Sequence, residues 1–350
     1  MAYTTIDNPE LYFQCKAYTG NSSTQAITLD GDENMQPDFV WIKNRNDGNN
    51  QAHVLYDSVR GATKFMQSAS TAAEATDSNG LTAFGSNGFT LGNSVEENTG
   101  FNYIAWCWKG GTTSGITTNG STTITPSAYS FNADAGIAIL QYTGNSTAGA
   151  KLAHGIGGCD AFWIKRTAAA GDDWRTYNRA LGGTKNIKLN SDDQAATGTN
   201  IFNDTDPDSV NITLGSHNSA NASDAMICYA FKSIQGFSKF GTYIGNGSTS
   251  GPYIHCGFRP SWVMCKIASG ANNDWTILDN KRDPFNVAEA RIYANTTGTE
   301  SDADRADFTA NGFKIRGDGN DTNGSGYTYT YYAFAESPFV NSKGVPNNAR

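Results

Sequence analysis

The side chains that most often carry out catalysis are few in this chain. It has four histidines and no G-x-S-x-G motif, the strained turn that presents a nucleophilic serine in many hydrolases. It also lacks an H-E-x-x-H motif and any cysteine and histidine cluster with the spacing of zinc ligands. We interpret the histidines as ordinary loop or strand-edge residues: His53, His154, His217 and His255. The sequence therefore favours neither a nucleophilic hydrolase nor a zinc enzyme.

Carboxylates are abundant, but their placement is typical of solvated loops. A glycosidase needs two carboxylates that converge on one bond, whereas the acidic residues here gather in loop sequence such as Asp30–Glu33 and Asp302–Asp304. The segment Asp321–Gly326 begins like a calcium-binding loop, yet Tyr332 stands where the acidic ligand at the twelfth position is expected. We interpret that segment as a glycine-rich hairpin loop. We predict that the protein is not an enzyme and has no catalytic residue, cofactor or bound metal.

Charge and composition exclude two classes of partner and indicate a fold class. The net charge of −8 would repel a phosphate backbone, so we expect no nucleic-acid binding. No apolar run approaches the roughly 20 residues that cross a bilayer, so we expect no membrane insertion. Charged residues make up only 17% of the chain, whereas aromatic residues reach 12% and glycines number 38. This composition is typical of β-sandwiches with polar loops.

The six cysteines show no C-x-x-C spacing and mostly lie inside apolar segments. Cys107 stands between two tryptophans, and Cys228 stands between an isoleucine and a tyrosine. Buried cysteines that lack a regular pairing behave as small apolar core residues. We therefore expect Cys107, Cys228 and Cys265 to be buried and reduced, in a chain that folds in the cytoplasm of a host cell.

Five segments recur three times in the same order, which is the strongest pattern in the sequence. The turn segment contains Gly-Asn and is Tyr18–Asn21, Tyr142–Asn145 and Tyr243–Asn246. The lysine strand is apolar and ends in lysine: Phe39–Lys43, Phe162–Lys165 and Trp262–Lys266. The Asx strand ends in Asp or Asn: Val54–Asp57, Trp174–Asn178 and Trp275–Asp279. A fourth strand, Gly88–Leu91, Val210–Leu214 and Gly312–Ile315, precedes the closing strand, Ile104–Trp108, Cys228–Phe231 and Tyr331–Phe334.

The repeated segments predict where the charged and aromatic side chains lie. The closing strand places a small residue between two aromatic ones, so period-two alternation puts the aromatic side chains on one face and the small residue on the other. Asp57, Asn178 and Asp279 occupy equivalent positions, and the Asn argues against an acid or base there and favours a turn or cap. We expect the lysine of the lysine strand to extend to water.

The repeat predicts an all-β protein of three tandem β-sandwich modules of jelly-roll type. We place them at residues 1–130, which include an N-terminal docking segment and a linker, at 131–236 and at 237–350. Residues 110–136 contain much Gly, Ser and Thr and are interpreted as loop or linker. We expect this linker to let the first module sit apart or reach a neighbouring subunit. We expect the short connection Phe237–Gly241 to hold the other two modules together as one rigid unit.

The repeated segments, with the opening Asn8–Phe13 and the closing Ala333–Phe339, resemble an uncharacterised module of tailed bacteriophages, common in marine phages. The resemblance extends from about Asp7 to Phe339. Such modules occur in tail-fibre-like and other virion proteins, so the resemblance implies a virion component, and it supplies no catalytic or ligand residue. The modules are also similar to concanavalin-like and SPRY-like sandwiches, a likeness of fold that does not establish sugar binding.

We therefore expect a structural protein on the virion surface, in a tail fibre, associated with the tail or decorating the head. We expect it to dock to other virion proteins, to contact host-surface glycan, and to act as a homo-oligomer, with a trimer as the first hypothesis. The apolar run Leu11, Tyr12 and Phe13 is the candidate docking segment. Two alternatives remain open, a glycan-binding lectin-like protein and a polysaccharide-depolymerase tail protein.

Overall fold

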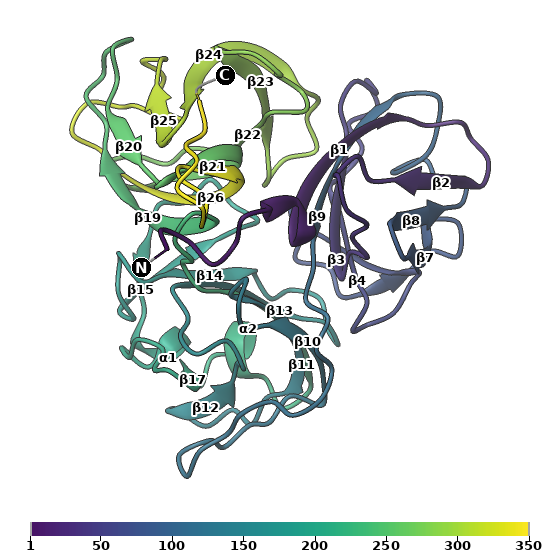
Figure 1. The fold of residues 1–350 in the computed structure, drawn as a ribbon. Coiled ribbons are helices and arrows are strands. Elements are labelled where there is room, and N and C mark those ends of the chain that lie inside the picture. The colour runs from purple at the N-terminus through teal and green to yellow at the C-terminus, as the bar shows by residue number, and fades with distance from the viewer. Residues whose placement is uncertain (1, 349–350) are drawn as a thin grey trace.

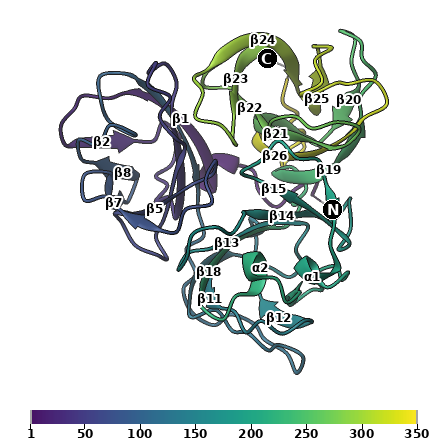
Figure 2. The same ribbon diagram turned by 180° about the vertical axis from the view of Figure 1, so that it is seen from behind.

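A computed structural model describes residues 2–348 of the chain. The chain is built from antiparallel β-sheets that form three lobes around a common centre, as Figures 1 and 2 show from opposite sides. We call the lobes unit 1 (residues 2–110), unit 2 (111–236) and unit 3 (237–348). An all-β fold is thus confirmed, with layered sheets consistent with β-sandwiches. No helix in residues 2–348 is long and apolar enough to cross a membrane.

Unit 1 consists of a six-stranded sheet and a three-stranded sheet. The larger sheet has the spatial order β1 (Phe13–Thr19), β9 (Asn102–Trp108), β3 (Phe39–Asn44), β4 (Val54–Asp57), β5 (Lys64–Gln67) and β6 (Ala75–Thr76). The smaller sheet has the order β2 (Gln25–Thr28), β8 (Gly88–Leu91) and β7 (Leu81–Gly85). The 3-10 helix η1 (Pro9–Leu11) precedes β1. The apolar faces of the two sheets enclose a core of their own.

Unit 2 repeats this strand order with one added edge strand. Its larger sheet has the order β10 (Ala128–Asn132), β11 (Ile137–Thr143), β18 (Ala225–Phe231), β13 (Ala161–Arg166), β14 (Arg175–Asn178), β15 (Lys185–Lys188) and β16 (Ala196–Thr197). The second sheet pairs β12 (Ala150–Ala153) with β17 (Asn211–Leu214). The helices α1 (Thr199–Phe202) and α2 (Asn218–Asn221) lie in the connections on either side of β17.

Unit 3 forms a single eight-stranded sheet whose order again begins in the same way. The order is β19 (Ser238–Ile244), β26 (Thr328–Pro338), β21 (Phe258–Ser269), β22 (Thr276–Asp279), β23 (Ala288–Tyr293), β24 (Ser301–Thr309), β25 (Gly312–Ile315) and β20 (Tyr253–His255). In each unit the closing strand lies between the turn-segment strand and the lysine strand. The turn-segment, lysine, Asx and closing strands therefore occupy matching places in the three larger sheets.

The units share one large hydrophobic core, which we call the central core. The closing strands supply aromatic side chains to it, because strand alternation turns Trp106 and Trp108 inward while Cys107 faces the inner core of unit 1. The Trp108 ring lies 6.5 Å from Trp163 of unit 2 and 5.8 Å from Trp262 of unit 3. Burying several indoles together removes a large apolar area from water. The central core thus joins the three units.

Two expectations about the chain between the first and second modules are wrong. The boundary predicted at residue 130 lies inside β10, which pairs with β11 of unit 2. Residues 110–136 are not a free linker, since Ile116 and Ile124 pack against the core of unit 2. Unit 1 does not sit apart either, because its aromatic residues belong to the central core. The composition of that segment is polar, but a few apolar residues suffice to hold it on the sheet.

Candidate functional site

The lysine that ends each lysine strand is buried at a contact between two units. Lys43, Lys165 and Lys266 are 0% exposed, so the expectation that they extend to water is wrong. Each ammonium donates to one carbonyl of its own unit and to one of a neighbouring unit. The neighbour's oxygens, with their distances from Nζ, are Thr297 O at 2.9 Å from Lys43, Thr71 O at 3.1 Å from Lys165 and Asp192 O at 2.6 Å from Lys266. Each lysine therefore bridges two units.

Burial perturbs all three lysines in the same direction. Loss of hydration disfavours the charged ammonium, and it lowers the pKa of Lys43, Lys165 and Lys266 from 10.5 to about 8. The own-unit carbonyls that they contact belong to Gln51, Asp172 and Asn273. A neutral amine still has two N–H groups, so both carbonyls keep a donor when the proton leaves.

A second contact between units comes from a ring N–H at the start of each Asx strand. The side chains at this position are His53, Trp174 and Trp275. Each ring nitrogen contacts the backbone carbonyl of the last residue of a strand in the neighbouring unit. The distances are 3.0 Å from His53 Nε2 to Tyr293 O, 3.0 Å from Trp174 Nε1 to Gln67 O and 2.8 Å from Trp275 Nε1 to Lys188 O. His53 Nδ1 accepts from Trp41 Nε1, so Nε2 carries the proton that reaches Tyr293 O. Burial holds the pKa of His53 well below its usual value. His53 is thus a buried interface residue and not an ordinary loop residue.

The Asx residues receive a hydrogen bond from a closing-strand aromatic residue in two of the units. Tyr229 of unit 2 donates to Asp57 Oδ2 of unit 1 at 2.6 Å, and Trp106 of unit 1 donates to Asp279 Oδ2 of unit 3 at 3.0 Å. At the third contact, Tyr332 of unit 3 donates to Tyr177 O of unit 2 at 3.2 Å. The three contacts run in the same cyclic direction as those of the lysines, from unit 1 to 3, from 3 to 2 and from 2 to 1.

The Asx positions also cap their own turns, as predicted. Asp57 Oδ1 accepts from the backbone N–H of Arg60, and Asp279 Oδ1 accepts from that of Arg282. Both arginines are buried, and their Nε atoms lie 2.5 Å and 2.6 Å from the partner carboxylates. Asn178 caps the backbone of Ala180, and Leu181 occupies the arginine's place in unit 2. The neutral Asn178 fits at this position because unit 2 has no buried arginine that could offset the charge of a carboxylate.

The turn segments are held by a buried asparagine that the sequence analysis missed. Asn98, Asn221 and Asn323 are each 0% exposed. In each unit the asparagine Oδ1 accepts from the backbone of the turn-segment Asn, which is Asn21, Asn145 or Asn246. In every unit, the hydroxyl of the turn-segment tyrosine donates to the backbone carbonyl of the residue directly before the buried asparagine. The signal was available, since all three asparagines stand at a similar spacing before the closing strand.

Close packing explains the glycine of each turn segment. A Cβ at Gly20 would lie 1.9 Å from Thr99 O, and one at Gly144 would lie 2.1 Å from Ala222 O. Both distances are far shorter than a van der Waals contact, so only glycine lets the two backbones approach there. The Gly-Asn pair thus serves as one half of the clamp that the buried asparagine completes.

The candidate docking segment lies against unit 3 and the central core. Phe13 is 1% exposed, and its ring stacks on Phe334 at 5.0 Å. Tyr12 packs against Phe237 at 5.9 Å, and Leu11 is half-buried in η1. Upstream, Thr4 Oγ1 donates to Gln235 O, the last turn before unit 3. The segment therefore contributes to the fold of the monomer, and its docking role stays a prediction.

The remaining predicted residues lie apart from one another. His154 is buried and contacts backbone atoms, His217 caps α2, and His255 is exposed at the end of β20. Asp321 accepts from Arg305 at 2.8 Å and from Arg291 at 3.0 Å, so its carboxylate serves in ion pairs. The six cysteines are buried and free, which confirms the predicted burial of Cys107, Cys228 and Cys265.

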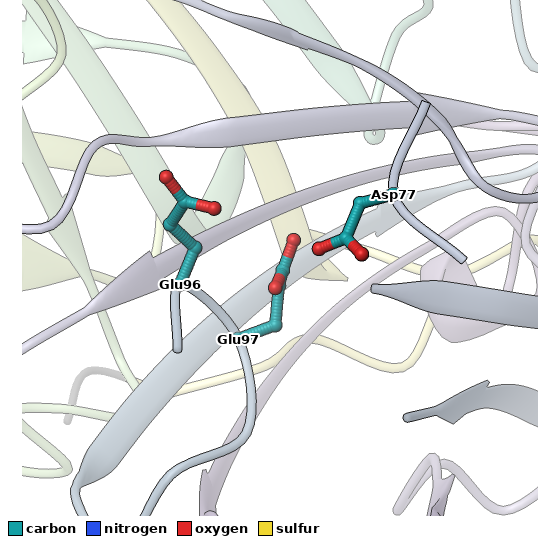
Figure 3. A group of neighbouring side chains, drawn as sticks. All are labelled: Asp77, Glu96 and Glu97. Carbon is teal, nitrogen blue, oxygen red and sulfur yellow. The ribbon is translucent and has the colours of Figure 1, made fainter. Parts of the chain in front are cut away.

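One acidic cluster stands out in the part of the chain that the structure describes. Asp77, Glu96 and Glu97 each offer an oxygen, and these oxygens lie within 4.8 Å of one another. Figure 3 shows the carboxylates of Glu97 and Asp77 directed toward each other, with Glu96 alongside. Glu97 is fully buried, and the other two are half-buried. This grouping joins residues that are separated in sequence and was not expected from it.

Comparison with known proteins places the chain in a family. No curated protein and no solved structure matches it. Residues 8–338 match a family described as a domain of unknown function, DUF7483. The match includes all the repeated segments and both sides of the lysine, ring N–H and closing-strand contacts between the units. The chain therefore belongs to the DUF7483 family.

Proposed function

We propose that this chain is a structural protein displayed on the surface of a bacteriophage particle. The observation that carries the proposal is that the polar and aromatic residues shared by the repeats are used between units, where they build a rigid body. The phage setting rests on the resemblance of the repeated segments to a module of tailed-phage virion proteins. The position on the particle is a tail fibre, a tail-associated site or the head surface.

We further propose that the three units are copies of one sandwich of jelly-roll type. Three observations support this. The sheets begin with corresponding strand orders, and the lysine, ring N–H and closing-strand contacts recur at all three junctions in one cyclic direction. A backbone hydrogen bond recurs as well, from Glu74 N to Thr167 O, from Ala195 N to Ala268 O and from Glu300 N to Arg45 O. An arrangement of independent domains would not require such a match.

A rigid centre leaves the outer loops to make contacts with other molecules. Loops on a stable scaffold commonly carry binding residues. We propose that these loops dock to other virion proteins and contact the host envelope, and that the chain assembles in the host cytoplasm. The homo-oligomer belongs to the proposal too. The three units within one chain already form a cyclic arrangement, so a trimer of chains is a separate question. Light scattering of the purified protein, which gives its molar mass in solution, will tell whether three chains associate.

The direct test is to look for the protein in purified particles. We expect mass spectrometry to find it at a fixed copy number per particle, and we expect antibody-gold labelling to reach it without disruption of the particle. A protein that is abundant in infected cells but absent from purified particles would contradict the proposal.

A glycan-binding role is the second candidate, and one surface cavity favours it. This hollow of about 350 Å³ lies between units 2 and 3. Its lining includes planar polar side chains able to pair with sugar hydroxyls: Arg175, Asn186, Gln194 and Asn272. Binding of the purified protein on a glycan array, lost on Asn272→Ala, would support a lectin. Release of reducing sugar from host polysaccharide, lost on changing one Asp or Glu, would instead support a depolymerase.

A further inference from the structure

The acidic cluster occupies the outer end of unit 1, at a place where two connections meet. Asp77 directly follows β6, and Glu96 and Glu97 lie in the connection from β8 to β9. The two connections are held together by backbone hydrogen bonds, from Gly92 N to Gly80 O and from Ser94 N to Asn79 O. The carboxylates are therefore brought together by ordered backbone, as Figure 3 shows.

Glu97 has an oxygen that nothing in the described chain satisfies. Its side chain is 0% exposed. Oε1 accepts from Tyr56 Oη at 2.5 Å, whereas Oε2 is buried and has no hydrogen-bond partner among residues 2–348. A buried carboxylate oxygen without a partner destabilises the fold, because it has lost its hydration and gained nothing in return. A ligand that supplied positive charge at Oε2 would remove this cost.

The protein supplies no positive side chain at the cluster. Within the described residues, no lysine or arginine forms an ion pair with Asp77, Glu96 or Glu97. Burial raises the pKa of Glu97 to about 7, and repulsion by Glu96 and Asp77 adds to the shift, although the hydrogen bond from Tyr56 opposes it. The three carboxylates therefore lie together with no cationic side chain of residues 2–348 paired to them.

Unit 3 shows the alternative solution at the matching position. The buried asparagines Asn98 and Asn323 are equivalent, so the second residue before each is equivalent too, namely Glu96 and Asp321. Asp321 is paired with two arginines, Arg291 and Arg305. In unit 1 the neighbours of Glu96 are two further carboxylates, those of Asp77 and Glu97. The difference is specific to unit 1 and is not required by the shared fold.

We propose that Asp77, Glu96 and Glu97 form a calcium-binding site. Carboxylate oxygens are the ligands that Ca²⁺ prefers, at about 2.3–2.6 Å, so oxygens on opposite sides of the ion stand about 4.8 Å apart. The oxygens of the cluster lie within 4.8 Å of one another, so one Ca²⁺ ion can contact all three carboxylates. Mg²⁺ usually keeps several waters and binds through one or two carboxylates, so a site of three carboxylates suits Ca²⁺ better. Asp77 and Glu96 are half-buried, so water completes the coordination from the open side.

The site would stabilise the outer end of unit 1. Its ligands join the turn after β6 to the connection that carries Asn98, and Asn98 holds the turn segment at Asn21. Binding to the folded chain alone raises its stability by mass action. Calcium would thus fix the outer loops of unit 1, which are among the surfaces proposed above for contact with other molecules. The inference does not depend on that proposed function.

Calorimetric titration of the full-length, chelator-treated chain with CaCl₂ at pH 8 tests the site. We expect one Ca²⁺ per chain, a rise in melting temperature, and a much weaker response to MgCl₂. Absence of heat and of a melting shift at millimolar calcium would overturn the proposal.

Three variants separate the site from a general effect of charge. Glu97→Gln keeps the shape and removes the charge, so we expect it to abolish binding while it melts, without calcium, at or above the wild-type temperature. The side chain of Asp77 is half-buried, so Asp77→Asn serves as the second variant if Glu97→Gln misfolds. We expect Asp77→Asn to weaken calcium binding at least tenfold. Glu33→Gln, at an exposed loop position, is the matched control and should bind as the wild type does. Wild-type affinity in both Glu97→Gln and Asp77→Asn would refute the assignment.

Discussion

The three units make the same kinds of contact at the centre of the molecule, whereas their outer ends differ from one another. At the centre, every junction uses a buried lysine, a ring N–H and a closing-strand aromatic residue. At the outer ends, unit 1 has an acidic cluster, unit 2 has two short helices and unit 3 has an arginine-paired aspartate. Units that share one core must solve the same packing problem three times, whereas solvated loops do not constrain one another.

The centre contains one exception that tests this account. Units 1 and 3 bury an Asp–Arg pair at the Asx position, whereas unit 2 has Asn178 and Leu181. A buried carboxylate is tolerated only when a cation and hydrogen bonds offset its lost hydration. The three units therefore agree in geometry but differ in charge, and the variants below probe both aspects.

The largest effect is expected at Asp279, which pairs with Arg282 and accepts from Trp106 of unit 1. Asp279→Ala leaves a buried arginine without its partner and should lower the free energy of unfolding by about 3–5 kcal/mol. Urea denaturation followed by tryptophan fluorescence measures the change. Asp134→Ala, in an exposed turn, is the control and should stay within about 0.5 kcal/mol. Equal effects of the two changes would contradict the distinction between centre and surface.

Asn178→Asp should destabilise by about 2–3 kcal/mol at pH 7, because it buries a carboxylate where Leu181 provides no charge. The loss should shrink at pH 4–5, where the new carboxyl takes up a proton. Combining it with Leu181→Arg should restore part of the stability. If Asn178→Asp is neutral at pH 7, the absence of an arginine is not the reason for the asparagine.

The asparagine clamp recurs in all three units away from the centre. Asn221→Ala removes the acceptor for Asn145 N and the donor to Gly215 O, so we expect a loss of about 2 kcal/mol. Asn34, at an exposed loop position of unit 1, offers the matched Asn→Ala control and should lose under about 0.5 kcal/mol. Hydrogen exchange should show faster opening of the turn segment in Asn221→Ala. An unchanged turn would mean that the backbone alone holds it.

The smallest expected effect is the pH dependence that each buried lysine contributes. The pKa of Lys165 is about 8 in the folded chain and 10.5 when unperturbed. Between these values the unfolded chain binds the extra proton, so stability rises with pH, by at most about 1.4 kcal/mol per pH unit for one lysine. We compare wild type with Lys165→Met from pH 8 to 9.5 and expect the difference in unfolding free energy to shift in favour of the wild type. If the unfolding free energies of the wild type and of Lys165→Met change in parallel over this pH range, Lys165 keeps its proton.

The sequence by itself determined the all-β class, the repeated segments and the local role of the Asx residues. These features depend on short-range rules. Strand alternation separates Trp106 and Trp108 from Cys107, and an Asx side chain caps the next few backbone N–H groups. Burial of the cysteines followed from the same alternation, because apolar neighbours on a strand share its environment.

Only the tertiary structure decided which faces of different units meet. A strand that ends in lysine has the same sequence whether Lys165 reaches water or Thr71 O of the neighbouring unit, so the local pattern could not predict its burial. The polar loop before β10 gave no sign that it would lie on unit 2, and the run at Phe13 no sign that it would enter the central core. Asp77 and Glu97 come together because two connections cross in space. Such contacts depend on long-range packing, for which single-chain spacing carries no signal.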